Sequence, residues 1–155
     1  MTVEAASPDE LARVAHMIDR WAAGALAAGG PLVAVDHDAE ACRWYLRMRG
    51  EDKEFISVWL TLAERTLRFE TYFMPAPEEN VEALWEYLLR VNARLFAMRF
   101  ALGDEDAVYL LGQLPVSAVD EPELDRILGA SWAYCEQYFR PAMSIGYASR
   151  YRPRR

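Results

Sequence analysis

The sequence has few of the residues that usually carry catalysis, metal binding or cross-linking. It contains two histidines and two cysteines in 155 residues. Cys42 and Cys135 are far apart in the chain and match no metal-ligand spacing, so we expect reduced thiols rather than a disulfide or a metal site. The sequence also has no phosphate-binding loop, dinucleotide fingerprint, zinc-protease motif or nucleophile elbow. We therefore expect no enzyme activity and no cofactor.

Long apolar runs and secretion signals are absent as well. No stretch approaches the roughly 18 apolar residues of a membrane span. The first ten residues, MTVEAASPDE, have neither the basic region nor the apolar region of a secretory signal. These absences favour a cytoplasmic location without a membrane partner. Because hydrophobic residues make up 53% and no Gly/Ser-rich linker occurs, we expect one domain over residues 1–155, with frayed termini at 1–6 and 152–155.

The charge of the chain is acidic and unevenly distributed. The net charge is −7, yet residues 140–155 contain five arginines and no acid, which leaves −12 on residues 1–139. This acidic body makes nucleic-acid binding an unfavoured function. The tail Arg150–Arg155 could contact phosphates or an acidic partner, but a solvated terminus is the favoured interpretation.

The clearest structural pattern is a run of three alternating segments, at residues 43–49, 55–62 and 66–73. Alternation of apolar and polar residues is typical of strands with one buried face. Pairing the apolar sets of the last two segments leaves a four-residue loop at 63–66. Before residue 55 we expect a three-residue turn with a bulge or a five-residue turn, with Leu46 opposite Ile56. The predicted register of the last two segments is Leu62–Leu67, Leu60–Phe69, Val58–Thr71 and Ile56–Phe73.

Three helices and two further strands complete the prediction. Ser7-Pro8 and Asp120 start helices, while Pro75-Ala76-Pro77 opens another with Glu78 and Glu79 in its first turn. Residues 95–102 and 107–114 read as strands, the second apolar enough to be covered on both faces. The fold class is therefore α+β, an antiparallel sheet of about five strands with three helices, in the order α-β-β-β-α-β-β-α.

Residues 32–40 give a weaker signal. Leu32–Val35 could form a minor strand, and residues 36–40 read as a polar loop. The sequence Asp36-His37-Asp38 contains metal-ligand types, but adjacent side chains point apart and seldom converge on one ion. We therefore expect no metal site.

The outward face of the predicted three-stranded unit is unusual, because an outward face is normally polar. It combines arginines and aromatic residues, which are enriched at binding hot spots. Three interpretations remain open: a partner or dimer surface, a face covered by a helix, or arginine stems that merely stack on rings. The residues on this candidate protein-binding face are Arg43, Tyr45, Arg47, Arg49, Phe55, Trp59, Arg68 and Tyr72.

Several sequence segments resemble those of the YbjN-domain family, in particular its actinobacterial branch. They are residues 44–50 (WYLRMRG), 71–80 (TYFMPAPEEN) and 112–115 (GQLP) with the helix that follows. The resemblance spans roughly residues 11–151. It implies a type III secretion chaperone-like α+β fold and a sensory or regulatory role, often as a dimer, among relatives by fold that bind polypeptides. It carries over no catalytic residue.

Two functions follow as hypotheses. The first is a non-enzymatic, chaperone-like or regulatory protein-binding module that forms a homodimer. The alternative is a small-molecule sensor or cryptic enzyme, with a pocket between the sheet and the last helix near Trp132, Tyr134 and Cys135.

Overall fold

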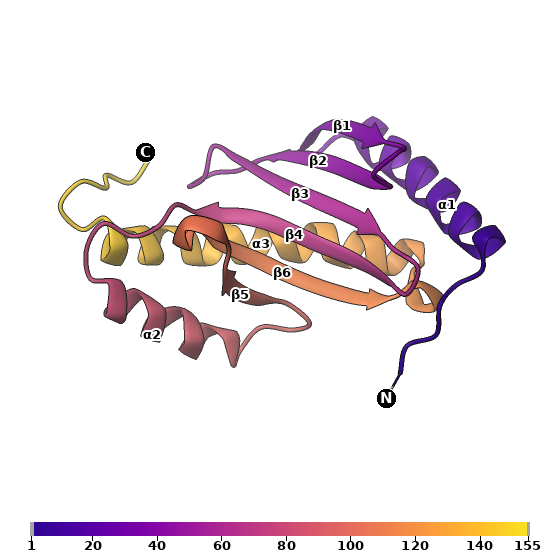
Figure 1. Cartoon of the computed structure of the whole chain (residues 1–155). Coiled ribbons are helices and arrows are strands. Elements are labelled where there is room, and N and C mark those ends of the chain that lie inside the picture. Colours follow the sequence, from indigo (N-terminus) through magenta and orange to yellow (C-terminus); the bar gives the residue numbers. More distant parts are fainter. Residues whose placement is uncertain (1, 155) are drawn as a thin grey trace.

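A computed structural model of the chain describes residues 2–154, which contain three α-helices and six strands. The strands form one antiparallel sheet in the order β1-β2-β3-β4-β6-β5, and α3 runs behind the strands in the view of Figure 1. The predicted α+β class is confirmed, with one strand more than expected. The elements are α1 (Pro8–Ala27), β1 (Leu32–Asp38), β2 (Arg43–Arg49), β3 (Phe55–Leu62), β4 (Thr66–Met74), α2 (Val81–Asn92), β5 (Arg99–Leu102), β6 (Val108–Pro115) and α3 (Glu121–Gly146).

The β3–β4 hairpin has the register that its apolar alternation predicts. Leu62 pairs with Leu67, and the ladder continues through Leu60–Phe69 to Val58–Thr71, where it ends. The fourth predicted pair, Ile56–Phe73, lies beyond the end of this ladder. Before β3, residues 50–54 form the five-residue turn that was one of the two predicted options. Leu46 consequently faces Val58 rather than Ile56, two residues from the predicted position but on the same face.

The minor strand at residues 32–35 was predicted too short. β1 continues to Asp38 and pairs with β2 along its length, so Asp36 and His37 belong to a strand and not to a loop. The strand extends through these polar residues because His37 contacts residues of β2 and α1. The His37 ring stacks on buried Trp44 at 4.4 Å, and its Nδ1 lies 3.1 Å from an Asp19 carboxylate oxygen on α1.

The second helix begins later than predicted. α2 starts at Val81, after an Asn80 in the left-handed conformation (φ 53°). Glu78 and Glu79 are therefore not in its first turn. Their backbone N–H groups donate to the Gly146 carbonyl at 3.0 and 3.1 Å, so they cap the end of α3 instead.

The fourth predicted strand was too long. Ala97 has a φ of +56°, which breaks an extended chain, and β5 contains only residues 99–102. Asn92 sets the start of β5, because its side-chain amide accepts from the Phe100 N–H at 2.7 Å and donates to the Phe100 carbonyl at 3.0 Å. Phe96, predicted in the apolar set of this strand, is 67% exposed.

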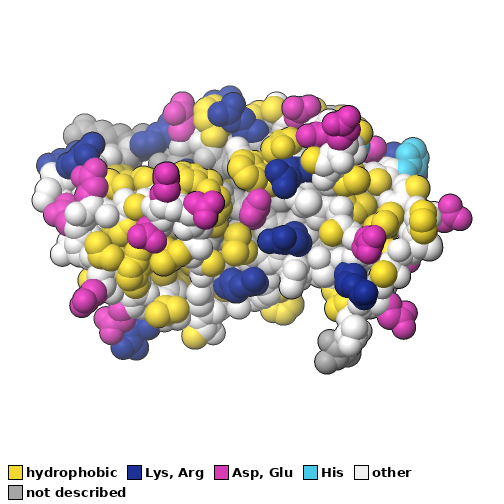
Figure 2. All heavy atoms as spheres, in the orientation of Figure 1, with side chains coloured by type: hydrophobic (Ala, Val, Ile, Leu, Met, Phe, Trp, Pro, Cys, Tyr) yellow, Lys and Arg dark blue, Asp and Glu magenta, His cyan; other side chains and the backbone are white. Residues whose placement is uncertain are grey.

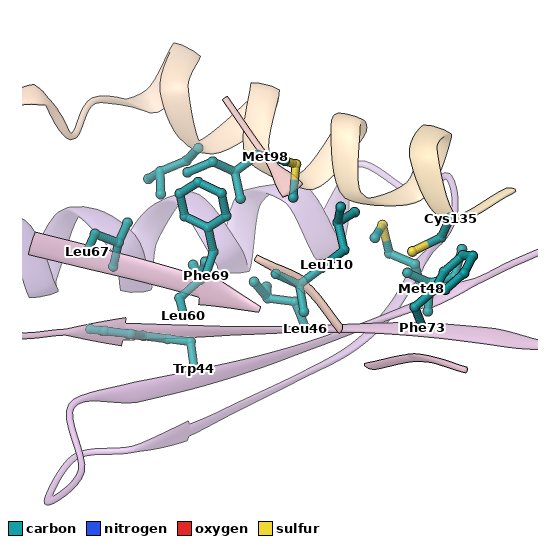
Figure 3. Packing of buried hydrophobic residues seen from close by; sticks show 14 of the residues in the cluster. Trp44, Leu46, Met48, Leu60, Leu67, Phe69, Phe73, Met98, Leu110 and Cys135 are labelled. Carbon is teal, nitrogen blue, oxygen red and sulfur yellow. The ribbon is translucent and has the colours of Figure 1, made fainter. Parts of the chain in front are cut away.

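The core lies between one face of the sheet and the helices (Figure 3). Ser7 caps α1 as predicted, and Asp120 caps α3. α3 continues through Pro141 to Gly146, so the proline does not end the helix, which was one of its two predicted effects. β6 is central in the sheet, as its apolar sequence suggested, but only one of its faces is buried: Leu110 is fully buried whereas Leu111 is half-buried.

Candidate functional site

The eight residues predicted to share the outward face of the sheet do lie together. Strand pairing places Arg43 beside Thr61, Tyr45 beside Trp59 and Arg49 beside Phe55. Arg68 is the neighbour of Thr61 on the other side, so the face is continuous from β2 to β4. We call the outward side chains of the six strands the open face. Besides the eight predicted residues it includes Asp36, Asp38, Ser57, Thr61, Glu70, Arg99, Tyr109, Leu111 and Gln113.

No helix in residues 2–154 packs on the open face, since all three helices bury their apolar stripes on the other side of the sheet (Figure 1). Tyr72 is 42% exposed and Arg47 and Arg68 are exposed. A covering helix, one of the open interpretations, is therefore wrong for these residues, whereas the predicted stacking of arginines on rings is present. Figure 2 views this face and shows Lys and Arg side chains among hydrophobic ones.

The arginines and rings of the open face hold one another in place. The Arg47 guanidinium carbon lies 4.1 Å from the Phe55 ring centroid, and Arg43 lies 6.0 Å from the Trp59 ring. Trp59 also meets the edge of Tyr45, with ring centroids 5.9 Å apart. Such contacts restrict long side chains without consuming their hydrogen-bond donors. The side chains of the open face are therefore ordered in the absence of a partner.

Shallow hollows surround Trp59. One of about 280 Å³ is lined by Ala34, Val35, Tyr45 and Trp59 among others, and a second of about 280 Å³ lies between Trp59 and Leu111. A smaller, polar hollow of about 170 Å³ is lined by Arg43, Thr61, Arg68 and Glu70. The indole therefore forms a ridge between depressions that can accept the side chains of another molecule.

The turn between β2 and β3 is held by side chains of α3 that are distant in the sequence, and no sequence pattern predicted these contacts. The Glu136 carboxylate on α3 accepts backbone N–H groups from Glu51, Asp52 and Lys53 at 2.9, 2.7 and 3.3 Å. Arg140 adds a contact to Asp52 at 2.8 Å. These bonds fix the turn to the helix.

Lys53, the sole lysine of the chain, lies in this turn, and its side chain contacts rings of β4 and α3. Its ammonium lies 5.5 Å from the Tyr72 ring and 4.9 Å from the Phe139 ring. Burial lowers the pKa of Lys53. The lysine therefore acts mainly as a packed cation that joins Tyr72 to α3.

A second surface feature, also missed by the sequence, lies where α2 meets β5. A mostly apolar groove of about 320 Å³ is lined by residues that include Trp85, Leu88, Leu89, Phe100 and Leu102. Leu89 is 70% exposed and Leu102 is 52% exposed. We call the residues that line this groove the α2–β5 patch; hydrophobic side chains gather in this region in Figure 2.

The residues proposed for a small-molecule pocket are engaged in contacts within the fold. The Trp132 indole N–H donates to the Arg49 carbonyl at 2.9 Å, and the Tyr134 hydroxyl accepts the Phe96 N–H at 3.0 Å. Cys135 is fully buried, and burial raises the pKa of its thiol to about 12. Such a thiol is a packing group rather than a nucleophile.

Other candidate sites find little support. In residues 2–154 no group of three or more His, Cys, Asp or Glu side chains is arranged to hold a metal, and His37 faces the core side while Asp36 and Asp38 lie on the open face. Over the same residues, no helix has the length and apolar character of a membrane span.

The basic C-terminal tail is partly engaged within the fold. Arg150 pairs with Glu78 at 2.6 Å rather than extending freely, and Arg155 of the predicted tail lies outside the described residues.

Comparison with known proteins identifies a family and a fold. Residues 8–142 match the family model of YbjN, described as "Putative bacterial sensory transduction regulator". An uncharacterized protein of Mycobacterium tuberculosis is 34% identical over 104 residues, which are 67% of this chain and 57% of the relative. One from Mycobacterium leprae is 29% identical over 107 residues, 69% of this chain and 58% of the relative. The chain thus spans less than two thirds of the curated relatives that it matches.

Solved structures with a similar fold include one from a type III secretion system. A chain of the ExsC-ExsE complex superposes with a TM-score of 0.56 at 19% identity, covering 81% of this chain and 93% of that one. A chain of the ExoU-SpcU complex of Pseudomonas aeruginosa gives a TM-score of 0.53 at 16% identity, with coverages of 81% and 97%. The similarity shows a type III secretion chaperone-like fold, as the sequence resemblance implied.

Proposed function

The chain belongs to the YbjN family, and we propose that it is a cytoplasmic, non-enzymatic module of chaperone-like or regulatory type that binds another protein through the open face. The observation that carries the proposal is a preorganised sheet face of arginines and aromatic rings that no helix in residues 2–154 covers. Its fold neighbours support a protein partner, because they come from structures of two-protein complexes.

The proposal predicts that substitutions on the open face abolish partner recovery without unfolding the chain. We expect the Trp59→Ala/Arg47→Ala double variant to lose the proteins that the unaltered chain retains in affinity purification with mass spectrometry. Truncating a central Trp or Arg hot spot typically costs 2 kcal/mol or more, which is about a 30-fold loss of affinity.

Arg13→Ala is the matched control, because Arg13 is an exposed arginine on α1. This variant should recover the same proteins as the unaltered chain. Equal recovery by the double variant, with an unchanged circular dichroism spectrum, would reject the open face as the binding surface.

The proposal includes a homodimer, and the α2–β5 patch is the surface that best fits a second copy. Leu89 projects beside an apolar groove that could receive Leu89 of another molecule. The charge distribution also suits a twofold contact, since Glu82 and Glu86 precede Arg90 on α2, and Arg94 follows just after the end of the helix. An antiparallel, twofold packing of α2 on its copy brings the acidic half of one helix to the basic half of the other.

Leu89→Asp is expected to convert the dimer into a monomer, because it places a charge in the middle of the apolar contact. Size-exclusion chromatography with light scattering should show the unaltered chain at twice 17.7 kDa and the variant at 17.7 kDa. Leu26→Asp is the control, since Leu26 is an exposed leucine (38%) on α1, outside the patch. A single mass near 18 kDa for the unaltered chain at high concentration would contradict the dimer.

The alternative, a small-molecule sensor or cryptic enzyme, has one supporting observation in the groove of the α2–β5 patch, whose volume of about 320 Å³ falls in the range of ligand pockets. This groove lies away from the predicted pocket near Trp132. Thermal-shift screening against metabolites and nucleotides separates the two functions, because a shift of several degrees from one compound favours the sensor.

A further inference from the structure

We propose that the partner of the open face is an acidic polypeptide segment, which places a carboxylate between Arg43 and Arg68 and an apolar side chain beside Trp59. This inference rests on the proposed protein-binding function and specifies the chemistry of the partner. It is carried by the pairing of charges on the open face, by the geometry of the polar hollow and by the apolar hollows next to it.

The arginines of the open face form no ion pair within the described residues, 2–154. Five of them share the face, and in residues 2–154 none has a carboxylate oxygen within 4.0 Å of its guanidinium. This occurs in a chain with 24 acidic and 17 basic residues, in which arginines elsewhere, such as Arg126 and Arg140, do form ion pairs. The five are Arg43, Arg47, Arg49, Arg68 and Arg99.

Two of these arginines converge on one small site. Arg43 donates through Nε to the Thr61 hydroxyl at 3.1 Å, which orients its guanidinium and leaves the terminal nitrogens free. Arg68 is the cross-strand neighbour of Thr61, and both arginines line the polar hollow of about 170 Å³. Glu70 also lines it, so the hollow keeps a net charge of +1. A guanidinium with free donors prefers a planar, bidentate acceptor, and a carboxylate fits this requirement.

The surroundings of the polar hollow favour a polypeptide. The hollow of about 280 Å³ beside Trp59 and Tyr45 is largely apolar and can receive an aliphatic or aromatic side chain. An extended segment that crosses the sheet presents alternate side chains to it, so apolar and acidic residues can occupy neighbouring hollows.

A nucleic acid fits this surface less well. Asp36, Asp38 and Glu70 lie on the same face, and the chain has a net charge of −7. A polyphosphate would meet repulsion along most of its length, whereas nucleic-acid affinity depends on neutralising many phosphates. A short segment with a few carboxylates needs only the arginine-lined part of the face.

Fluorescence anisotropy with defined probes tests this chemistry on the full chain. Three labelled 12-residue peptides share the same leucine and phenylalanine positions and carry Glu, Gln or Lys at four others, and a 12-nucleotide single-stranded DNA supplies a polyanion without side chains. We expect the Glu peptide to bind about 10-fold more tightly than the Gln peptide at low salt, with the Lys peptide weakest. Arg68→Glu should lose this preference and bind the Lys peptide better, while Arg13→Glu should keep it.

Each remaining outcome overturns the inference. Equal binding of the Gln and Glu peptides, lost in Trp59→Ala, leaves the protein-binding function in place but rejects an acidic partner. Tighter binding of the DNA than of the Glu peptide rejects a polypeptide. Absence of binding by all three peptides rejects it too. Failure of the proposed function is recognised separately, by partner recovery that survives the Trp59→Ala/Arg47→Ala change.

Discussion

Leu60→Ala is expected to lower the free energy of unfolding by about 2–5 kcal/mol, whereas Trp59→Ala, one residue earlier in the same strand, is expected to lower it by about 1 kcal/mol. Leu60 is fully buried and is paired with Trp44 and Phe69 across the strands on either side, so its removal leaves a cavity. Trp59 lies on the open face, where its truncation removes contacts with Tyr45 and Arg43 but opens no cavity.

Urea denaturation of both variants measures this difference directly, because the two substitutions are in one strand and share a secondary-structure context. The binding measurement should show the opposite order: Leu60→Ala, studied below its unfolding midpoint, should keep its partner, and Trp59→Ala should lose it. A Trp59→Ala variant that is as unstable as Leu60→Ala would mean that the indole is part of the core, and it would remove the main reason to assign a binding role to the open face.

The parts of the fold that sequence alone predicted are those controlled by local alternation. The register of β3 and β4 follows because Leu60 and Phe69 must share the buried face, and a shift by one residue would expose both. The same parity placed all eight candidate residues on one side of the sheet. The alternation of side chains along a strand cannot tell whether a helix docks on that side, since docking depends on contacts between distant segments.

The parts that sequence did not predict depend on side chains from elsewhere in the chain. β1 extends through polar residues because the His37 ring stacks on Trp44 and its Nδ1 lies 3.1 Å from an Asp19 carboxylate oxygen. β5 is short because Ala97 adopts a positive φ and Asn92 defines where pairing resumes. Phe96 and Leu102 are therefore exposed, although the alternation grouped them with Met98 and Phe100, and Leu102 belongs to the α2–β5 patch.

Two glycine-to-alanine substitutions are expected to change stability in opposite directions. Gly112 on β6 pairs with Phe69, and a Cβ at Gly112 would lie 2.3 Å from the Phe69 ring and 2.8 Å from the Ala97 carbonyl oxygen. Phe69 is only 2% exposed and has no free space to move into, so we expect Gly112→Ala to cost about 1–3 kcal/mol. Gly129 is exposed on α3, and beyond its chain neighbours and the local helix backbone no atom lies within 4 Å of its would-be Cβ, so Gly129→Ala should add about 1 kcal/mol through helix propensity.

Thermal unfolding should separate the two variants, since 1 kcal/mol corresponds to about 2–4 °C in Tm for a chain of this size. A double-mutant cycle identifies the cause of the Gly112 effect. If the Phe69 ring is what the new methyl group meets, Phe69→Leu and Gly112→Ala together should cost about 1 kcal/mol less than the sum of the single changes. Strict additivity would assign the cost to the Ala97 carbonyl instead. It would then be the left-handed backbone before β5, rather than the ring packed across β4 and β6, that requires glycine at this position.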